Sequence, residues 1–139
     1  MQAKNDPVAV IQAVNRAADS GDITGMVAFF SDKAVVKLDP PLPAPFRSEY
    51  RGRPEIRSYV NTLVTHGFHV DSSNFSAKGD EVTWHSRITG GPFGEEGIEA
   101  EADSQAVVRD GLIDWLKVHY SPQSVQALSQ ALSHARQPQ

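Results

Sequence analysis

The sequence predicts an α+β fold, because helical periodicity in its first half gives way to strand alternation in its second half. Apolar residues recur at spacings of three and four as far as Val64, and from Gly67 onward the period becomes two. A last amphipathic segment follows Pro122. At 139 residues the chain is long enough to enclose one core. We therefore expect one domain over residues 1–139, with a core over about 6–122 and a C-terminal helix over about 122–135.

Three helices are expected in the first half. The first begins at Asp6-Pro7, since Asp is a good N-cap residue and Pro suits the first turn, and Gly21 can end it. Its apolar stripe consists of Val8, Ile11, Val14, Asn15 and Ala18. A second, shorter helix has an acidic start at Gly21-Asp22 and brings together Ile23, Met26, Val27 and Phe30. The third begins at Pro54 and buries Ile56, Tyr59, Val60, Leu63 and Val64.

Five strands are expected, one early and four in succession. They cover residues 34–38, 68–75, 81–89, 97–109 and 112–120. The turns between the last four contain Lys78-Gly79-Asp80, Gly90-Gly91-Pro92 and Asp110-Gly111. Residues 40–45 hold four prolines, which cannot continue a helix or an inner strand. We expect that segment to form a stiff flap packed over the domain.

Composition excludes several classes of function. The formal net charge is −4, whereas a surface that follows nucleic acid needs an excess of Lys and Arg. No apolar run approaches the roughly 20 residues of a membrane helix, and no signal segment opens the chain. Cysteine is absent, which removes disulfides and thiolate chemistry. We expect a cytoplasmic protein that binds neither nucleic acid nor membrane and uses no cofactor.

Five short motifs resemble the nuclear transport factor two-like superfamily, particularly its SnoaL-like polyketide cyclase and ketosteroid isomerase branches. The matching segments are Gly21-Asp22-Ile23-Thr24-Gly25, Asp32-Lys33-Ala34-Val35-Val36, Leu38-Asp39-Pro40, Tyr50-Arg51-Gly52-Arg53-Pro54-Glu55-Ile56 and Arg109-Asp110-Gly111-Leu112-Ile113. The resemblance covers about residues 6–122. It implies a cone-shaped, curved mixed β-sheet wrapped around the N-terminal helices, with an apolar pocket between them and an outer sheet face through which such proteins commonly dimerise.

The resemblance also implies catalytic candidates. Asp39 occupies the place of the steroid isomerase base, and Asp103 lies eight residues before Gly111, the place of a protonated Asp that binds the dienolate oxygen. Val14 stands where the usual Tyr donor would be, so Tyr120 is a second candidate donor. Asp103 also alternates with Glu99 and Glu101, a pattern more typical of a solvated strand face. Asp39-Pro40 is equally a common turn start.

Two other chemistries match less well. The resemblance to an epoxide hydrolase would need an Asp-Arg-Asp set, which is broken here: Thr89 stands where an Asp is expected two residues after Arg87, and Val118 stands at the Asp position of the last strand. The histidines form no predicted metal site, although His85 is a second-choice acid or base. Arg47, Arg51, Arg53 and Arg57 cluster near the flap and the third helix. Arg51 and Arg53 could attract an anionic group at the pocket mouth, or could be solvated or paired with neighbours such as Glu49 and Glu55.

Strand alternation separates pocket residues from outer ones. The predicted pocket lining consists of Val14, Phe30, Tyr59, Leu63, Trp84, Leu116 and Val118. His85, Trp115 and His119 fall on the other face, where an exposed Trp predicts a partner subunit and hence a homodimer. The expected function is cofactor-free isomerase, cyclase or hydrolase chemistry on a small apolar carbonyl or cyclic compound, with Asp39, Asp103 and Tyr120 as acid–base groups. The alternative is a non-catalytic ligand-binding or dimeric interaction module.

Overall fold

The computed structural model describes residues 6–39, 46–65, 67–90 and 100–136 of the chain. The elements in chain order are α1 (Pro7–Asp19), α2 (Ile23–Ala28), β1 (Phe30–Asp39), β2 (Glu49–Arg51), α3 (Gly52–Thr65), β3 (Phe68–Lys78), β4 (Glu81–Gly90), β5 (Ala100–Arg109), β6 (Leu112–Tyr120) and α4 (Pro122–Arg136). The predicted flap over residues 40–45, the turn residues Gly91-Pro92 and positions 97–99 lie outside the described residues.

The first two helices start at the predicted capping residues. The Asp6 side chain accepts a hydrogen bond from the Val8 N–H at 3.0 Å, with Pro7 in the first turn. Asp22 accepts from the Gly25 N–H at 2.9 Å in the same way. The second helix ends at Ala28, so Phe30 opens β1 instead of belonging to the helix as predicted. Its side chain is still buried.

The strands of the described residues form one six-stranded mixed sheet, in the order β2-β1-β6-β5-β4-β3. β1 and β6 are parallel and the other neighbours antiparallel. The β5–β6 turn at Asp110-Gly111 has positive φ at both residues, as a tight hairpin turn requires. The sequence analysis did not predict β2. A strand of three residues is too short to show an alternation of apolar and polar residues, and it is recognised only by its pairing with β1.

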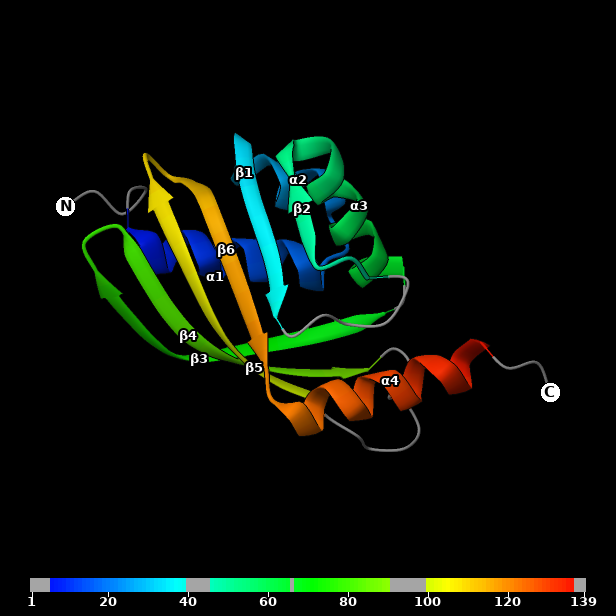
Figure 1. The fold of residues 1–139 in the computed structure, drawn as a ribbon. Coiled ribbons are helices and arrows are strands. Elements are labelled where there is room, and N and C mark those ends of the chain that lie inside the picture. The colour runs from blue at the N-terminus through cyan, green and yellow to red at the C-terminus, as the bar shows by residue number, and fades with distance from the viewer. Residues whose placement is uncertain (1–5, 40–45, 66, 91–99, 137–139) are drawn as a thin grey trace.

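The sheet curls around the helices to form the predicted cone (Figure 1). In β3 the pairing register shifts between Ser73 and Ser76, and Asn74 within that shift has a φ of 57°. Such a bulge increases the local bend and twist of a strand. α1 packs mainly against β3 and α3 against β1, which leaves a space enclosed by helices and sheet. α4 follows β6 and lies apart from the other helices in Figure 1.

The core lies between the concave sheet face and the helices. Val36, Val82 and Ile113 from the sheet meet Ile56 and Val60 from α3 there, each 1% exposed or less. Burial of such side chains from water is the main stabilising term for a domain of this size. None of the helices in the described part of the chain is long and apolar enough to cross a membrane.

Candidate ligand cavity

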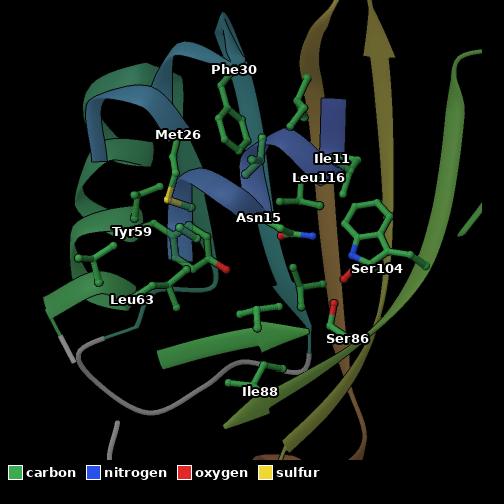
Figure 2. A pocket seen from close by; sticks show the side chains of 18 of the residues that line it. Ile11, Asn15, Met26, Phe30, Tyr59, Leu63, Ser86, Ile88, Ser104 and Leu116 are labelled. Carbon is green, nitrogen blue, oxygen red and sulfur yellow. The ribbon is translucent and has the colours of Figure 1, made fainter. Parts of the chain in front are cut away.

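A cavity of about 110 Å³ opens between the helices and the concave face of the sheet (Figure 2). Its lining comes from α1, α2, α3, β1, β3, β4, β5 and β6, together with Phe46 before β2. The β5 residues that line it, Ala100 and Ser104, have small side chains, which leaves space on the inward face of that strand. The volume is of the same order as the roughly 150 Å³ apolar cavity that accommodates benzene in another protein.

All seven residues predicted to face the pocket lie along the cavity. They are Val14, Phe30, Tyr59, Leu63, Trp84, Leu116 and Val118, and Tyr120 joins them. Their positions agree with the prediction because strand and helix periodicities decide which face a residue occupies, whatever the details of packing. Trp84 is fixed further by stacking against Phe75, with ring centroids 6.1 Å apart. That these residues bind a ligand stays a prediction.

Four buried hydroxyl groups face this apolar lining. Ser86 and Ser104 are each 4% exposed, and Tyr59 and Tyr120 are 7% and 6% exposed. None of the four side-chain hydroxyls has a hydrogen-bond partner among the described residues. Figure 2 shows Tyr59 on one wall and Ser86 and Ser104 together on the opposite one. No fully buried side-chain polar atom among the described residues lacks a hydrogen-bond partner, so these four hydroxyls are open to the cavity space and available to a ligand.

The serines and Asn15 were not among the predicted site residues. Ser86 and Ser104 lie on the inward faces of β4 and β5, and Trp84 pairs with Ser104 across the two strands. Their signal is the same alternation that predicts Trp84 as inward, but small hydroxyl residues are too common in strands to stand out. Asn15 lies between the two walls in Figure 2, and its side-chain amide donates to Ser72 Oγ at 2.7 Å.

The three tyrosines of the chain lie close to one another, and Tyr59 and Tyr120 line the cavity. The Tyr50 and Tyr59 rings lie 5.0 Å apart, and Tyr50 Oη accepts a hydrogen bond from the Arg47 N–H. Burial raises the pKa of Tyr59 well above its ordinary value, and the proximity of Tyr120 and Tyr50 raises it further. Burial, followed by the proximity of Tyr50, also raises the pKa of Tyr120. Both cavity phenols are therefore neutral hydrogen-bond donors at ordinary pH.

The expectation that Asp39 and Asp103 face the pocket is corrected by the structure. Both side chains lie on the outer face of the sheet, 50% and 80% exposed. The physical reason is strand phase, since Leu38 points inward before Asp39, and Ala102 and Ser104 point inward on either side of Asp103. Among the described residues that line the cavity there is no carboxylate, imidazole or amine.

The outer acids form pairs with histidines instead. His119 Nδ1 lies 3.2 Å from Asp39 Oδ2, and Lys117 Nζ lies 3.9 Å from the same oxygen. His85 contacts two carboxylates, Asp103 at 3.0 Å through Nδ1 and Glu101 at 2.9 Å through Nε2. His85 is thus outward, as its alternation with Trp84 predicts. Within the described part of the chain, no three His, Asp or Glu side chains are arranged to hold a metal ion.

The arginines near α3 pair with acids at the surface. Arg47 reaches Glu55 at 3.2 Å, Arg51 pairs with Glu49, and Arg53 reaches Asp32 at 3.1 Å. Arg53 also donates from Nε to the Phe30 carbonyl at 2.8 Å, which ties α3 to the start of β1. Arg47, Arg51 and Arg53 therefore take part in ion pairs at the surface.

The environment of His85 predicts a pH-dependent contribution to stability. The hydrogen bond to Asp103 raises its pKa above the ordinary 6.5, Glu101 adds to the effect, and partial burial opposes it. A group whose pKa is higher in the folded state than in the unfolded state contributes its full stabilisation below the unfolded-state pKa. That stabilisation of the folded state is lost as the pH rises through the folded-state pKa. Relative to the His85→Gln variant, the wild type should therefore lose stability as the pH rises from below 6.5. Urea denaturation midpoints at several pH values measure this, and a wild-type-to-variant difference that is constant with pH would contradict it.

These observations define the class of protein: an α+β cone whose curved sheet and N-terminal helices enclose an apolar cavity. The sequence model of the SnoaL-like domain family matches residues 11–115, most of the chain, and the chain belongs to that family. It has the nuclear transport factor two-like fold. No curated protein matches the sequence.

Solved structures agree on the fold. TerC co-crystallised with polyporic acid superposes with a TM-score of 0.71 at 15% identity, covering 89% of this chain and 98% of TerC. A putative ketosteroid isomerase from Kribbella flavida gives a TM-score of 0.66 at 12% identity, covering 86% and 78%. A hypothetical protein with a ketosteroid isomerase-like fold from Catenulispora acidiphila, in complex with trimethylamine, gives a TM-score of 0.69 at 17% identity, covering 87% of this chain and 92% of that protein. At such identities the likeness establishes the fold alone.

Proposed function

We propose that the cavity binds a small, largely apolar ring compound that carries an oxygen acceptor. The observation that carries this proposal is the set of four unpartnered hydroxyls in an otherwise apolar cavity of about 110 Å³. An apolar ligand gains from leaving water, and its oxygen can accept from Tyr59 or Tyr120, whose raised pKa values keep them protonated. This volume suits a compound with one ring.

The hydroxyls on the opposite wall extend the proposed ligand class. Ser86 and Tyr120 belong to one row across the sheet, since each pairs with Ala102 on β5. A ring compound with oxygen functions at two ends would contact the Tyr59 phenol of α3 at one end and the hydroxyls of the sheet, Ser86, Ser104 and Tyr120, at the other. A ligand with one oxygen would use the phenols alone.

The absence of a base among the described cavity residues favours binding over proton abstraction by the protein. Asp39 and Asp103 cannot act on a ligand in this cavity from the other face of the sheet, and a phenol with a raised pKa is a poor base. The paired phenols support one catalytic alternative, in which they polarise a ligand carbonyl and stabilise the enolate form of it. That alternative retains the isomerase or cyclase character expected from the sequence, but moves it from the carboxylates to Tyr59 and Tyr120.

A pair of one-ring probes tests the proposal. Acetophenone should bind more tightly than ethylbenzene, which has similar size and no carbonyl, in calorimetric or NMR titrations. Tyr59→Phe together with Tyr120→Phe should weaken acetophenone binding about three- to thirtyfold, the effect of one or two lost hydrogen bonds, and leave ethylbenzene binding unchanged. Asp39→Asn is the control and should change neither affinity.

The same samples distinguish binding from catalysis. Exchange of the acetophenone methyl protons in D₂O, followed by NMR, should stay at the solvent rate if the cavity only binds. Exchange that the protein accelerates and that Tyr120→Phe abolishes would support the phenol-assisted enzyme instead. If neither probe binds, or if both probes bind equally to the wild type and the double variant, the proposed site is wrong.

A further inference from the structure

A row of polar side chains crosses the concave face of the sheet and ends at Asn15 of α1. The strand register places Ser72 of β3 beside Ser86 of β4. Ser86 and Tyr120 belong to the same row, because both pair with Ala102 of β5. Asn15 Nδ2 donates to Ser72 Oγ at 2.7 Å, which joins α1 to the β3 end of the row. Asn15, Ser86 and Tyr120 all line the cavity, so the row contributes hydroxyls and one amide to the same space.

The amide of Asn15 differs chemically from the hydroxyls around it. A hydroxyl group rotates and can both donate and accept, whereas an amide oxygen only accepts. Because Nδ2 donates to Ser72, the oxygen is the free end of the amide, and no described residue donates a hydrogen bond to it. Figure 2 shows this oxygen on the Tyr59 side of the cavity and the nitrogen on the opposite side. The cavity thus contains an acceptor whose donor has to come from water or from a ligand.

The cavity lining also determines the charge of that donor. Among the described residues that line the cavity there is no carboxylate to pair with a ligand ammonium, and no cationic side chain to pair with a ligand carboxylate. Moving an ion from water into such a space without a partner is strongly unfavourable. The donor opposite Asn15 is therefore a neutral hydroxyl or N–H group, and the ligand as a whole carries no charge.

We propose that Asn15 is a specificity-determining residue of the cavity, which selects neutral ring compounds that carry a hydroxyl or N–H donor as well as an oxygen acceptor. The inference rests on the proposed function, since it assigns a second polar group to the same ligand. The ligand oxygen accepts from Tyr59 or Tyr120, and the ligand donor binds Asn15 Oδ1. Ser72 is a positioning residue, because its contact with Nδ2 keeps the oxygen end of the amide free. A hydroxylated aromatic ketone meets both requirements within one ring.

The selection follows from the cost of burying a donor without a partner. A methyl group enters an apolar cavity without losing hydrogen bonds, whereas a hydroxyl group gives up its bonds to water. Opposite Asn15 Oδ1 the hydroxyl regains one of them, and opposite an apolar side chain it does not. The difference corresponds to about five- to hundredfold in affinity. A ring ether or a second carbonyl would place its lone pairs against the amide oxygen, so Asn15 also discriminates against ligands that only accept.

Hydroxyl and methyl groups at the same ring position test the proposal, because they are similar in size and only the hydroxyl donates. The probes are meta- and para-hydroxyacetophenone and the two matching methylacetophenones, titrated calorimetrically in buffer that keeps the ligand phenol neutral. The hydroxyl isomer that binds the wild type more tightly should lose about tenfold or more in affinity in Asn15→Leu, which removes the acceptor and keeps a similar shape. Its methyl counterpart should change by less than about threefold.

Two further variants and one spectroscopic measurement keep the test decisive. Ser72→Ala releases the amide and should lower the hydroxyl-to-methyl affinity ratio in the same direction by a smaller factor, and it carries the test if Asn15→Leu is unfolded by circular dichroism. Asn61→Leu makes the same substitution at an exposed position of α3 outside the cavity and should leave every affinity unchanged. The NMR signal of the Asn15 side-chain amide should shift with the hydroxyl isomer and not with its methyl counterpart.

Acetophenone separates the failure of this inference from the failure of the proposed function. If Asn15→Leu weakens the hydroxyl and methyl compounds equally, or weakens neither, Asn15 does not select the ligand. Acetophenone binding that still depends on Tyr59 and Tyr120 would then leave the proposed function intact. If neither acetophenone nor a hydroxyl isomer binds the wild type, the proposed function and the role of Asn15 are both wrong.

Discussion

Ser104→Leu is expected to abolish acetophenone binding while leaving the protein at least as stable as the wild type. Ser104 is 4% exposed and lies between Trp84 of β4 and Val118 of β6, both of which line the cavity. A leucine side chain there occupies the space that the ligand needs. It also buries additional apolar surface and removes a hydroxyl that has no partner among the described residues, which should add about 1 kcal/mol to the free energy of unfolding.

Ser104→Ala is the matched control, because it removes the same hydroxyl without filling the space. It should retain acetophenone binding within about threefold, the value of one hydrogen bond at most. Calorimetric titration measures the affinity and urea denaturation the free energy of unfolding. If the Ser104→Leu variant still binds acetophenone like the wild type, the ligand occupies another part of the molecule. A large loss of stability would instead mean that the cavity cannot accept the added methyl groups.

Ile56→Ala is expected to lower the free energy of unfolding by about 2–5 kcal/mol, the usual cost of such a truncation in a core. Ile56 is 0% exposed and belongs to α3, which packs against β1. A domain of ordinary stability has only about 5–15 kcal/mol in total, so the loss is a large part of it. Tyr59 follows three residues later on the same helix, and acetophenone affinity should fall as α3 loosens.

The control for this substitution is Ile23→Ala, which removes the same atoms from a partly exposed position at the start of α2. Its cost should be less than half of that of Ile56→Ala, since less surface returns to water and the site can relax. Urea denaturation with a common slope measures both. Equal losses at the two positions would mean that α3 is not anchored through Ile56 as the structure indicates.

The sequence predicted which residues face the cavity because periodicity acts locally. Trp84 faces inward for the same reason that His85 faces outward: neighbouring residues of a strand alternate between faces. The helical stripe that contains Val14 faces the sheet because its apolar residues need burial. Residues a few positions apart determine these preferences. The packing of distant segments then places the inward face of the sheet against the apolar face of α1.

The motif matches did not predict on which face of the sheet Asp39 and Asp103 lie, because a motif match locates a residue along the chain and says nothing about strand phase. Asp39 and Asp103 keep the family spacing, yet each lies one residue out of phase with the inward positions of its strand. The alternation of Glu101 with Asp103 was the signal that indicated the outer face correctly. Tyr120, by contrast, has the inward phase of Val118 and lines the cavity.

By itself, the sequence determined the fold class, the helix starts at Asp6 and Asp22, the four-strand meander and the inward faces of its strands. Capping, turn and alternation preferences are local, and they survive whatever the chain packs against. Only the tertiary structure decided that four hydroxyls converge without a base beside them among the described residues, and that Asn15, Ser72, Ser86 and Tyr120 form one polar row. Both results depend on strand order and register, which pair residues far apart in the chain through hydrogen bonds that no local pattern encodes.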